Sequence, residues 1–245
     1  MSKFLKAIGA SNIYKSGKTF IYEESGVFKP TATTFYLLHH LKQETLVNKD
    51  ILDLGCGSGI IGFELFLFEP MIKKISMSDV SLEATIVAEK NSEELYGKNK
   101  ISIKHGSLFM PWNKQKFDVI VNDVSGISTL IPFYHDWFEG IPLETGSQGL
   151  NLFSEVISNC DNYLNKNGKV ISALISLSNV KQAYSIIKEA GLYFEILGRY
   201  FWSRKIKDSE ELNKMMELKS EGTVDFEVKD EKFEFYTEIL EIRRK

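Results

Sequence analysis

Cysteine is scarce in this sequence, and several marks of a secreted or membrane protein are missing. The 245 residues include two cysteines, Cys56 and Cys160, which are too few for the disulfide framework of a small secreted domain. No run of about 18 apolar residues occurs, so we expect no membrane-spanning helix. The first residues hold no uninterrupted apolar segment typical of a secretory signal. These absences favour a reducing, cytoplasmic location.

A large excess of charge of one sign is also missing. The 30 basic and 33 acidic residues leave a net charge of −3, which argues against a dedicated nucleic-acid binder. A local basic cluster near Arg199 and Arg204 keeps nucleic acid open as a partner, although such clusters are usually solvated surfaces. No spacing of His, Cys and Asp is typical of a metal site, so no metal is predicted.

Apolar runs of strand length alternate with segments of helical length along most of the chain. This alternation predicts an α/β fold with a sheet of about seven strands, mostly parallel with an antiparallel last strand, and helices on both faces. Residues 1–30 are predicted to form a β extension with strands at Thr19–Tyr22 and Gly26–Phe28. Residues 31–245 are predicted to form one domain with a helical insertion near 207–220. The strands are expected at Asp50–Leu54, Lys74–Ser78, Lys100–Lys104, Phe117–Asn122, Lys169–Ile175 (after a turn at Asn167-Gly168), Tyr193–Arg204 and Phe233–Ile242.

One stretch, Ile51–Gly62, combines a short apolar run, several glycines and the start of an apolar helix. A strand, a glycine turn and a helix in this order bring backbone N–H groups and a helix N-terminus close to a ligand. Asp53 lies at the end of the predicted strand, where its carboxylate can face the same crevice. Because ligands bind at the carboxyl ends of parallel strands, the site is expected at Asp53–Gly59, Asp79, Gly106–Leu108 and Asn122–Ser125.

The glycines fit more than one kind of nucleotide site. A phosphate-binding P-loop is disfavoured, because no lysine followed by serine or threonine comes after them. A dinucleotide site needs Gly-x-Gly-x-x-Gly, which Gly57, Gly59 and Gly62 satisfy, so this alternative stays open. Asp53 argues against it, since a carboxylate just before the loop repels a pyrophosphate and suits a cationic ligand.

Asp79 is the second landmark, 20 residues beyond Gly59 at the end of the next predicted strand. A carboxylate at this place can accept both hydrogen bonds from a ribose diol. The alternative is an acidic residue at a helix N-terminus, which the helix dipole stabilises by about 0.3–1 kcal/mol. The spacing therefore indicates adenosine or a similar nucleoside.

The glycine loop together with Ser78-Asp79-Val80-Ser81 resembles the class I S-adenosylmethionine-dependent methyltransferases, over roughly residues 26–205. The resemblance implies a Rossmann-like fold and S-adenosylmethionine as the cofactor. It implies that Asp53 and the loop hold the methionyl part, that Asp79 binds the ribose and that Val80 packs on adenine. Where the family usually has an aspartate beside the adenine, this chain has Ser107, followed by Leu108. The predicted cofactor-binding residues are Thr34, Asp53, Gly55, Cys56, Gly57, Ser58, Gly59, Asp79, Val80, Ser107, Leu108 and Asn122.

Two further segments are similar to the small-domain and protein-glutamine N-methyltransferases: Gly26-Val-Phe-Lys-Pro with Thr34, and Gly146-Ser-Gln-Gly-Leu-Asn-Leu-Phe. Those enzymes carry Asn-Pro-Pro-Tyr after the fourth strand, where the asparagine side chain and a proline carbonyl hold a planar amide or amine. This chain has Asn122-Asp123-Val124-Ser125. The asparagine is kept, and both prolines and the aromatic residue are absent.

Asn122 and Asp123 are the predicted catalytic residues. Methyl transfer from a sulfonium is an in-line displacement in which the enzyme mainly positions donor and acceptor. Asn122 can donate and accept hydrogen bonds and so orient an acceptor. Asp123 can serve as a base or bind a cationic substrate, and the alternative is that it caps a turn. The segment 126–147 is predicted to be either a substrate lid or core, and His135 within it is a further candidate base.

The leading hypothesis is methylation of a protein side chain or small molecule at nitrogen or oxygen. The alternatives are methylation of transfer or ribosomal RNA, an S-adenosylmethionine-binding protein without catalysis, and a dehydrogenase. Nucleic acid is not favoured as a partner, and no membrane partner is expected.

Overall fold

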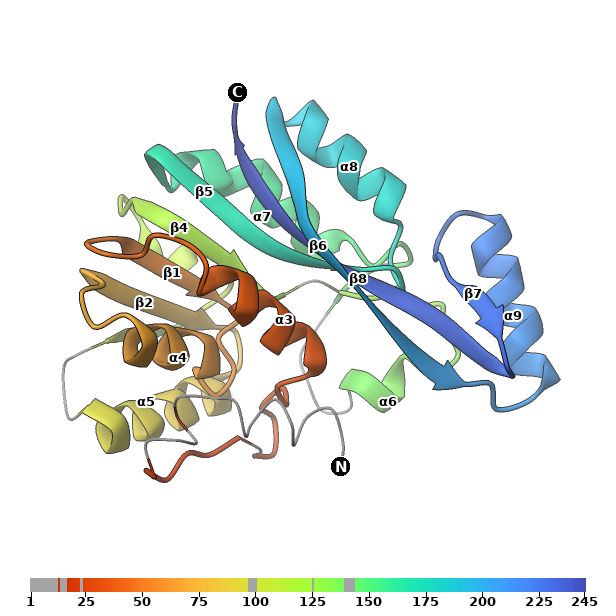
Figure 1. The fold of residues 1–245 in the computed structure, drawn as a ribbon, viewed down its shortest axis with the longest axis horizontal. Coiled ribbons are helices and arrows are strands. Elements are labelled where there is room, and N and C mark those ends of the chain that lie inside the picture. The colour runs from red at the N-terminus through yellow and green to blue at the C-terminus, as the bar shows by residue number, and fades with distance from the viewer. Residues whose placement is uncertain (1–12, 14–16, 23, 97–100, 125, 139–143) are drawn as a thin grey trace. The chain divides into compact units, whose positions relative to one another are not determined.

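A computed structural model describes residues 13, 17–22, 24–96, 101–124, 126–138 and 144–245 (Figure 1). These residues divide into two compact units. One comprises the described residues up to Asp123 together with Asn162–Ile171, and the other comprises the remainder. Among the described residues, no helix has the length and apolar character needed to cross a bilayer.

Parallel strands form the centre of the first unit. They are β1 (Asp50–Leu54), β2 (Lys74–Asp79), β3 (Ser102–His105) and β4 (Phe117–Asn122). β1 lies between β2 and β4, and β2 pairs with β3, all in parallel. Because the four strands run in one direction, their carboxyl ends meet at one edge of the sheet. The register places Leu54 opposite both Ser78 and Asn122, so the residues that follow β1 and β4 are neighbours.

The helices of this unit follow from local sequence signals. α3 (Ala32–Leu41) begins after the N-cap Thr31, and α4 (Ile60–Phe68) begins after Gly59 and ends two residues before Pro70. α5 (Leu82–Tyr96) is capped by Ser81, whose Oγ accepts from Ala84 N at 3.1 Å. A short 3-10 helix, η1 (Met110–Trp112), follows β3. The sequence predicts these α-helices at Thr31–Leu46, about Ser58–Glu69 and Ser81 to about Tyr96. The observed bounds agree to within a few residues, except that α3 ends at Leu41.

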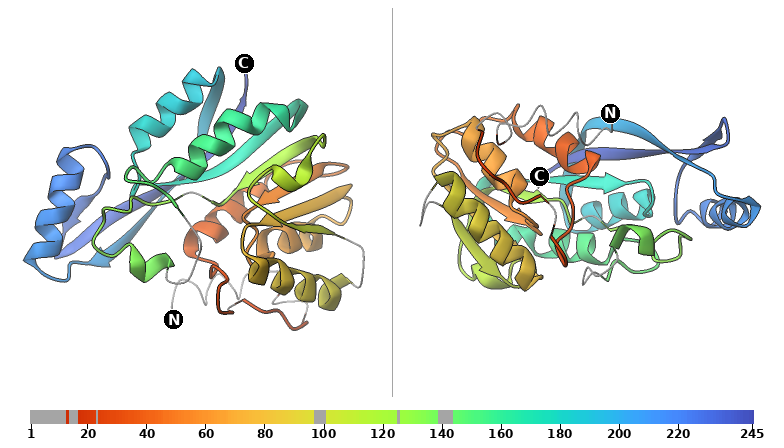
Figure 2. Two further views of the ribbon diagram at one scale, coloured as in Figure 1. Left: turned by 180° about the vertical axis from the view of Figure 1, so that it is seen from behind. Right: turned by 90° about the horizontal axis from the view of Figure 1, so that it is seen from below.

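The second unit is built around a long antiparallel ribbon. β6 (Leu192–Lys205) pairs with β8 (Lys232–Arg244) along nearly its whole length, and β7 (Glu227–Lys229) pairs with β8. α9 (Ser209–Ser220) lies beside β7, as the views from three sides agree (Figures 1 and 2). The unit also contains α6 (His135–Phe138), α7 (Asn151–Asn159), a 3-10 turn η2 (Cys160–Asn162, whose last residue falls in the first unit) and α8 (Val180–Glu189).

The strands follow the order β3-β2-β1-β4-β5-β8-β6, with β7 on β8, and β5 (Leu164–Ile175) contributes to both units. The predicted fold class, a mostly parallel α/β sheet of about seven strands with antiparallel strands at the C-terminal end, is therefore confirmed. The predicted helix near 207–220 is also present, as α9. The short strand β7 has no counterpart among the predicted strands.

The prediction of β-strands near the N-terminus is wrong for the described residues. Thr19–Tyr22 is irregular backbone, and Gly26–Phe28 is a bend leading into irregular backbone. The amide of Asn91 on α5 takes the place of a neighbouring strand: its Oδ1 accepts from Ile21 N at 2.8 Å and its Nδ2 donates to Ile21 O at 3.0 Å. Ile21 and Val27 pack on α5. The β-type side chains are therefore buried against a helix, and no sheet forms.

The predicted turn at Asn167-Gly168 is also wrong, because β5 runs unbroken from Leu164 to Ile175. The glycine serves a different purpose. A Cβ at Gly168 would lie 2.8 Å from the Phe117 carbonyl oxygen, closer than real Cβ contacts. Close approach to β4, rather than chain reversal, explains a glycine at this position.

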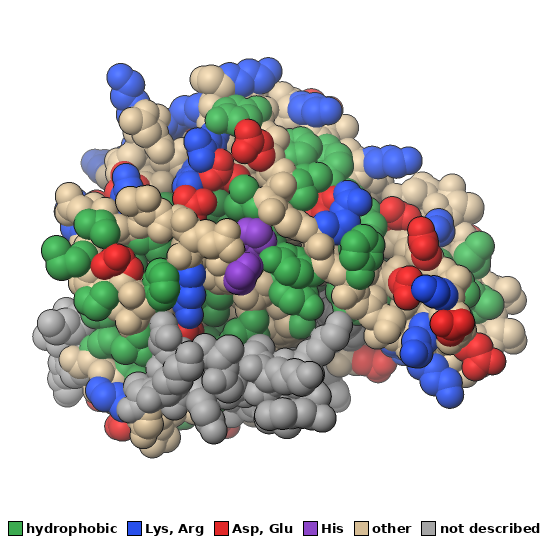
Figure 3. All heavy atoms as spheres, in the orientation of Figure 1, with side chains coloured by type: hydrophobic (Ala, Val, Ile, Leu, Met, Phe, Trp, Pro, Cys, Tyr) green, Lys and Arg blue, Asp and Glu red, His purple; other side chains and the backbone are tan. Residues whose placement is uncertain are grey.

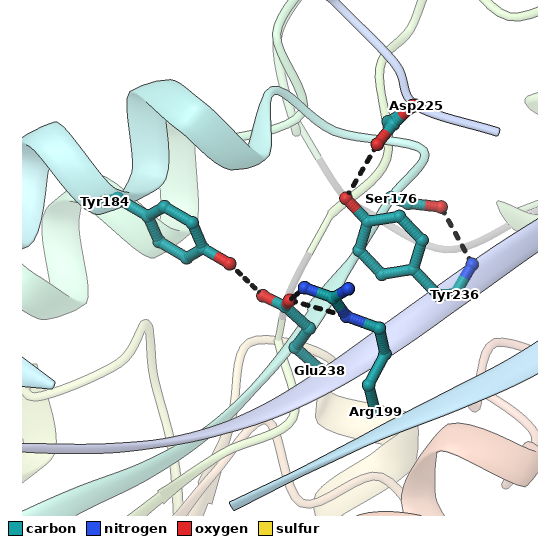
Figure 4. A network of polar contacts seen from close by, with 6 residues as sticks. All are labelled: Ser176, Tyr184, Arg199, Asp225, Tyr236 and Glu238. Atoms are coloured by element: carbon teal, nitrogen blue, oxygen red, sulfur yellow. Dashed lines mark hydrogen bonds and ion pairs between the residues drawn. The ribbon is translucent and has the colours of Figure 1, made fainter. Parts of the chain in front are cut away.

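A polar network lies on the β6–β8 ribbon of the second unit (Figure 4). The buried Glu238 carboxylate accepts from Arg199 Nε at 2.9 Å, forms an ion pair with the same guanidinium, and accepts from the Tyr184 hydroxyl of α8. Tyr236 lies beneath Arg199, with the guanidinium carbon 4.7 Å from its ring centre, and donates to Asp225. Glu238 is fully buried, so its charge depends on these donors.

Replacing Arg199 with methionine is expected to lower the free energy of unfolding by about 2 kcal/mol, because a buried carboxylate loses its cationic partner. The arginine is 45% exposed, which keeps the effect below that of a fully buried pair. Urea unfolding measures the change. The Tyr184→Phe variant, which removes one neutral donor, is the matched control and should cost about half as much. An unchanged unfolding midpoint for Arg199→Met would show that the pair contributes nothing.

Candidate active site

The glycine loop after β1 is fixed to the end of β2 by its backbone. The N–H groups of Gly55 and Cys56 both donate to Ser78 O, at 2.8 and 3.1 Å. Gly55, Gly57 and Gly59 have φ values of 67°, 53° and 84°, which side chains disfavour. The loop then enters α4, where the Gly59 carbonyl accepts from Phe63 N at 3.0 Å. The predicted strand–turn–helix arrangement is present, and glycine is required by its backbone angles.

Asp79 ends β2 and reaches into the glycine loop. Its Oδ2 accepts from Gly57 N at 2.8 Å, and its Oδ1 accepts from Ser81 N at 2.9 Å. Burial raises the pKa of the carboxyl, and the hydrogen bonds from Ser81 and Gly57 act in the opposite direction. Each carboxylate oxygen has a second lone pair, so the group keeps the capacity to accept two further hydrogen bonds.

Asp53 is fully buried at the end of β1. Its Oδ2 accepts from Gly62 N at 3.3 Å, while its Oδ1 has no hydrogen-bond partner among the described residues. Burial raises the pKa of Asp53 well above its ordinary value, and the negative charge of Asp123 adds to this effect. A buried carboxyl oxygen without a donor is costly in the free protein, and a ligand that supplies a donor or a positive charge relieves that cost.

Asn122 and Asp123 lie where β4 ends, beside the start of the glycine loop. Asn122 is fully buried and stands opposite Leu54 in the sheet. The Oδ2 atom of Asp123 accepts from Thr34 Oγ1 of α3 at 2.8 Å. Burial raises the pKa of Asp123 to about 7. Thr34 of α3 and the end of β4, which are 89 residues apart in the sequence, therefore meet at this carboxyl group.

The remaining predicted cofactor residues surround the end of β2. Val80 is 44% exposed, so its side chain is available to a ligand. Leu108 is buried with a φ of 43°, and its carbonyl accepts from Ser78 Oγ at 3.0 Å. Ser107 adjoins it and is partly buried. Cys56 is buried, which raises the pKa of its thiol well above the ordinary value and keeps it protonated. Ser58 is buried with a hydroxyl that has no partner among the described residues.

Two residues that support the loop were not predicted from the sequence. The Ser78 carbonyl accepts hydrogen bonds from the loop, and the Ser78 hydroxyl donates to the Leu108 carbonyl. Asn91 donates to Ser58 O at 3.0 Å through the same amide that holds Ile21. A polar residue in the middle of a predicted helix carries no signal of its own. Asn91 is the third polar residue in the run Glu89–Glu94, which is typical of a solvated helix face.

The described part of the segment after β4 belongs to the second unit, and four of its apolar side chains are buried in the core of that unit. Phe133 and Tyr134 are buried in the cluster formed by Ile127, Ile131, Phe133, Tyr134, Ile175, Leu177, Met215, Leu218, Val224, Phe226, Phe233 and Phe235. This favours the core alternative over a free lid for these two aromatic residues. His135 is exposed, and Ser125 lies outside the described residues. No group of His, Cys, Asp and Glu able to hold a metal ion occurs within the described part of the chain.

Comparison with known families identifies the segment that carries these residues. Residues 18–123 match the family described as the methyltransferase small domain. This segment, somewhat under half of the chain, is therefore similar to the methyltransferase small domain. It contains every residue proposed above for the cofactor and for catalysis, from Thr34 to Asp123. The resemblance based on the glycine loop is thereby confirmed for this family.

Individual proteins are similar to this chain over segments of different length. A bifunctional methyltransferase of Rickettsia felis is 34% identical over 128 residues, which are 49% of this chain and 24% of that protein. A Methanocaldococcus jannaschii protein named as a protein N5-glutamine methyltransferase is 28% identical over 173 residues, 71% of this chain and 84% of the relative. The chain thus spans about a quarter of the length of the Rickettsia protein.

Solved structures share the fold at low sequence identity. Mtq2 in the E. cuniculi Mtq2–Trm112 complex, which methylates the termination factor eRF1, is matched with a TM-score of 0.57 at 16% identity, covering 90% of this chain and 99% of that chain. The methyltransferase SMU.776, solved with SAH, is matched with a TM-score of 0.51 at 11% identity, covering 85% of this chain and 50% of that chain. These identities support the class I methyltransferase fold alone.

Proposed function

We propose that this chain is an S-adenosylmethionine-dependent methyltransferase that modifies a protein side chain. The observation that carries the proposal is the joining of Asp79 to the glycine loop, with Asn122 at the end of the neighbouring strand β4. A carboxylate able to bind a nucleoside and a polar side chain able to orient the methyl acceptor therefore lie at one edge of one sheet. A cytoplasmic location remains a prediction.

The residues fit the proposed cofactor on three observations. Asp79 keeps acceptor capacity for a ribose diol after binding Gly57 and Ser81. The buried Asp53 Oδ1 and Ser58 Oγ atoms have no partner within the described residues, so a polar ligand can supply one. Acidic groups dominate the described site, which suits a ligand with an ammonium and a sulfonium. A pyrophosphate fits the same acidic site poorly, which disfavours the dinucleotide alternative.

The bound cofactor supplies an electrophilic methyl group on a positively charged sulfur. Asn122 holds the acceptor in line, because its side-chain amide can accept from the acceptor's N–H and donate to a neighbouring oxygen. In such a transfer the methyl group would pass to the acceptor nitrogen, and the electron pair of its bond to sulfur would stay on sulfur. Asp123 is placed to take the proton that the acceptor nitrogen loses.

The acceptor is proposed to be a side-chain amide nitrogen. The N5-glutamine methyltransferase name of the M. jannaschii relative supports this choice. Asn122 retains the asparagine of the Asn-Pro-Pro-Tyr pattern, while Asp123 and Val124 replace its prolines. Stacking on an aromatic ring is thus replaced by polar contacts as the proposed means of holding the amide.

Transfer of labelled methyl groups into fractionated cell extract tests the function. Label is expected in protein, and the Asn122→Ala variant should leave the protein fraction unlabelled. Label in RNA that survives protease would overturn the protein acceptor. Charges of both signs are interspersed over the face drawn in Figure 3, which offers little support for an extended RNA-binding surface there. Binding of S-adenosylmethionine with no transfer into any fraction would support the non-catalytic alternative.

A further inference from the structure

The Asp123 carboxyl lies close to where a sulfonium would sit in the proposed site. It follows Asn122, which stands opposite Leu54, so Asp123 adjoins the beginning of the loop at Gly55. The negative charge of Asp123 contributes to the raised pKa of Asp53, which agrees with this placement of the two carboxyl groups. A cofactor held between the glycine loop and Asn122 therefore has the Asp123 carboxyl as a neighbour.

Thr34 fixes the direction of this carboxyl. Its Oγ1 donates to Asp123 Oδ2 at 2.8 Å. The Thr34 Oγ1 atom also accepts from Thr31 N at 3.3 Å. Thr34 is only 3% exposed, so packing at the start of α3 limits its motion. The hydroxyl therefore donates to one carboxylate oxygen and leaves the other for a ligand.

We infer that Asp123, held by Thr34, makes the site select S-adenosylmethionine over the product S-adenosylhomocysteine, and that this preference grows as the pH rises. The inference rests on the proposed function and extends it to the release of product. The two ligands differ by one methyl group and by the charge on sulfur. An ionised carboxylate distinguishes them because it attracts a sulfonium and has no such attraction for a thioether.

The pH range follows from burial. Because burial raises the pKa of Asp123 to about 7, the carboxyl is mostly neutral in the free protein below that pH and mostly ionised above it. A bound sulfonium favours the ionised form, so binding below that pH drives a proton from Asp123 into solvent. Affinity for S-adenosylmethionine therefore increases with pH through this range, while affinity for S-adenosylhomocysteine changes less.

Several other ionisable groups lie near Asp123, and the Asp123→Asn variant described below separates their titration from its own. Asp53, on β1, faces Asp123 and is more completely buried, with a pKa raised well above its ordinary value. The charge of Asp79, on β2, raises the pKa of Asp53, and the Asp79 carboxylate accepts hydrogen bonds from two backbone N–H groups. Cys56, in the loop, has a thiol whose pKa burial raises further. Thr34 on α3 contributes only an uncharged donor.

Titration calorimetry with both ligands at about pH 6 and about pH 8 tests the inference. The ratio of the dissociation constant of S-adenosylhomocysteine to that of S-adenosylmethionine is expected to rise about tenfold across this range. In Asp123→Asn, which keeps the shape and an oxygen that can accept from Thr34, the ratio should stay constant. This matched variant also subtracts the titration of the ligands' own amino groups.

A second variant tests the inference without removing the carboxyl group of Asp123. Thr34→Val removes the donor to the ionised carboxylate, so the pKa of Asp123 should rise and the pH midpoint of the ratio should move upward. Thr34→Ser, which retains the hydroxyl, should leave the midpoint in place. A ratio that does not change with pH, or that changes equally in Asp123→Asn, overturns the inference alone. Absence of binding by both ligands would overturn the proposed function with it.

Discussion

The Asp79→Ala variant is expected to bind S-adenosylmethionine about 100-fold more weakly than the native protein. The carboxylate is proposed to accept two hydrogen bonds from the ribose, and losing two charge-assisted bonds costs about 3 kcal/mol in total. Removing the carboxylate also frees Gly57 N and Ser81 N, which loosens the loop that cradles the methionyl part. Titration calorimetry measures the dissociation constant directly.

Two matched variants separate these contributions. Asp79→Asn keeps one oxygen that can accept from Gly57 N or Ser81 N but removes the charge, so its affinity should lie between those of the native protein and Asp79→Ala. Asp136→Ala removes an exposed carboxylate of α6 outside the site and should bind like the native protein. Equal affinity of the native and Asp79→Ala proteins would refute the assignment of the ribose to Asp79.

Replacing Asn122 with alanine is expected to lower kcat about 1000-fold, while the dissociation constant of S-adenosylmethionine changes less than about threefold. The amide is proposed to hold the acceptor nitrogen in line, and loss of positioning affects the reaction more than the cofactor. Single-turnover transfer of labelled methyl, with calorimetry of the cofactor, separates the two quantities. Asn122 is fully buried, so thermal unfolding of the variant must accompany the assay.

Asn122→Gln is the informative control for this prediction. It retains the amide but moves it by one methylene, so a positioning role predicts a large loss of kcat in this variant as well. Asn159→Ala changes an asparagine of α7, whose Nδ2 donates to Glu155 O, and should leave transfer unchanged. If Asn122→Ala transferred methyl groups at the native rate, Asn122 would have no part in catalysis.

The order of the helices and strands could be predicted because hydrophobic periodicity and the residues that begin or end helices are local features of the sequence. The strands β1 and β4 appear as apolar runs, and Pro70 and Ser81 mark where helices end and begin. The errors arose where a tertiary neighbour decided the structure. Thr19–Tyr22 has β-type residues, yet its hydrogen-bond partner is the side chain of Asn91. Asn167-Gly168 is typical of a turn, yet it lies inside β5 where the chain approaches Phe117 closely.

The site was predictable to a similar extent. The positions of Asp53, Gly57 and Asp79 at one edge of the sheet could be predicted, because the strand ends and the glycines fix them along the chain. Ser78 and Asn91 support the same loop through hydrogen bonds that no spacing of residues in the sequence predicts. Whether Phe133 and Tyr134 form a lid or a core depends on Phe226 and Phe235, which are about a hundred residues away and complete the cluster.

The sequence by itself determined that a glycine loop with acidic residues on either side follows the first strand of a parallel sheet, and this arrangement is the basis of the proposed class of ligand. These features need only backbone angles and the strand order, which neighbouring residues specify. The tertiary structure alone decided that Thr34 directs the Asp123 carboxyl and that burial brings its pKa to about 7. The ionisation of a carboxyl depends on which groups replace water around it, and folding brings those groups from α3, β1 and β4 together.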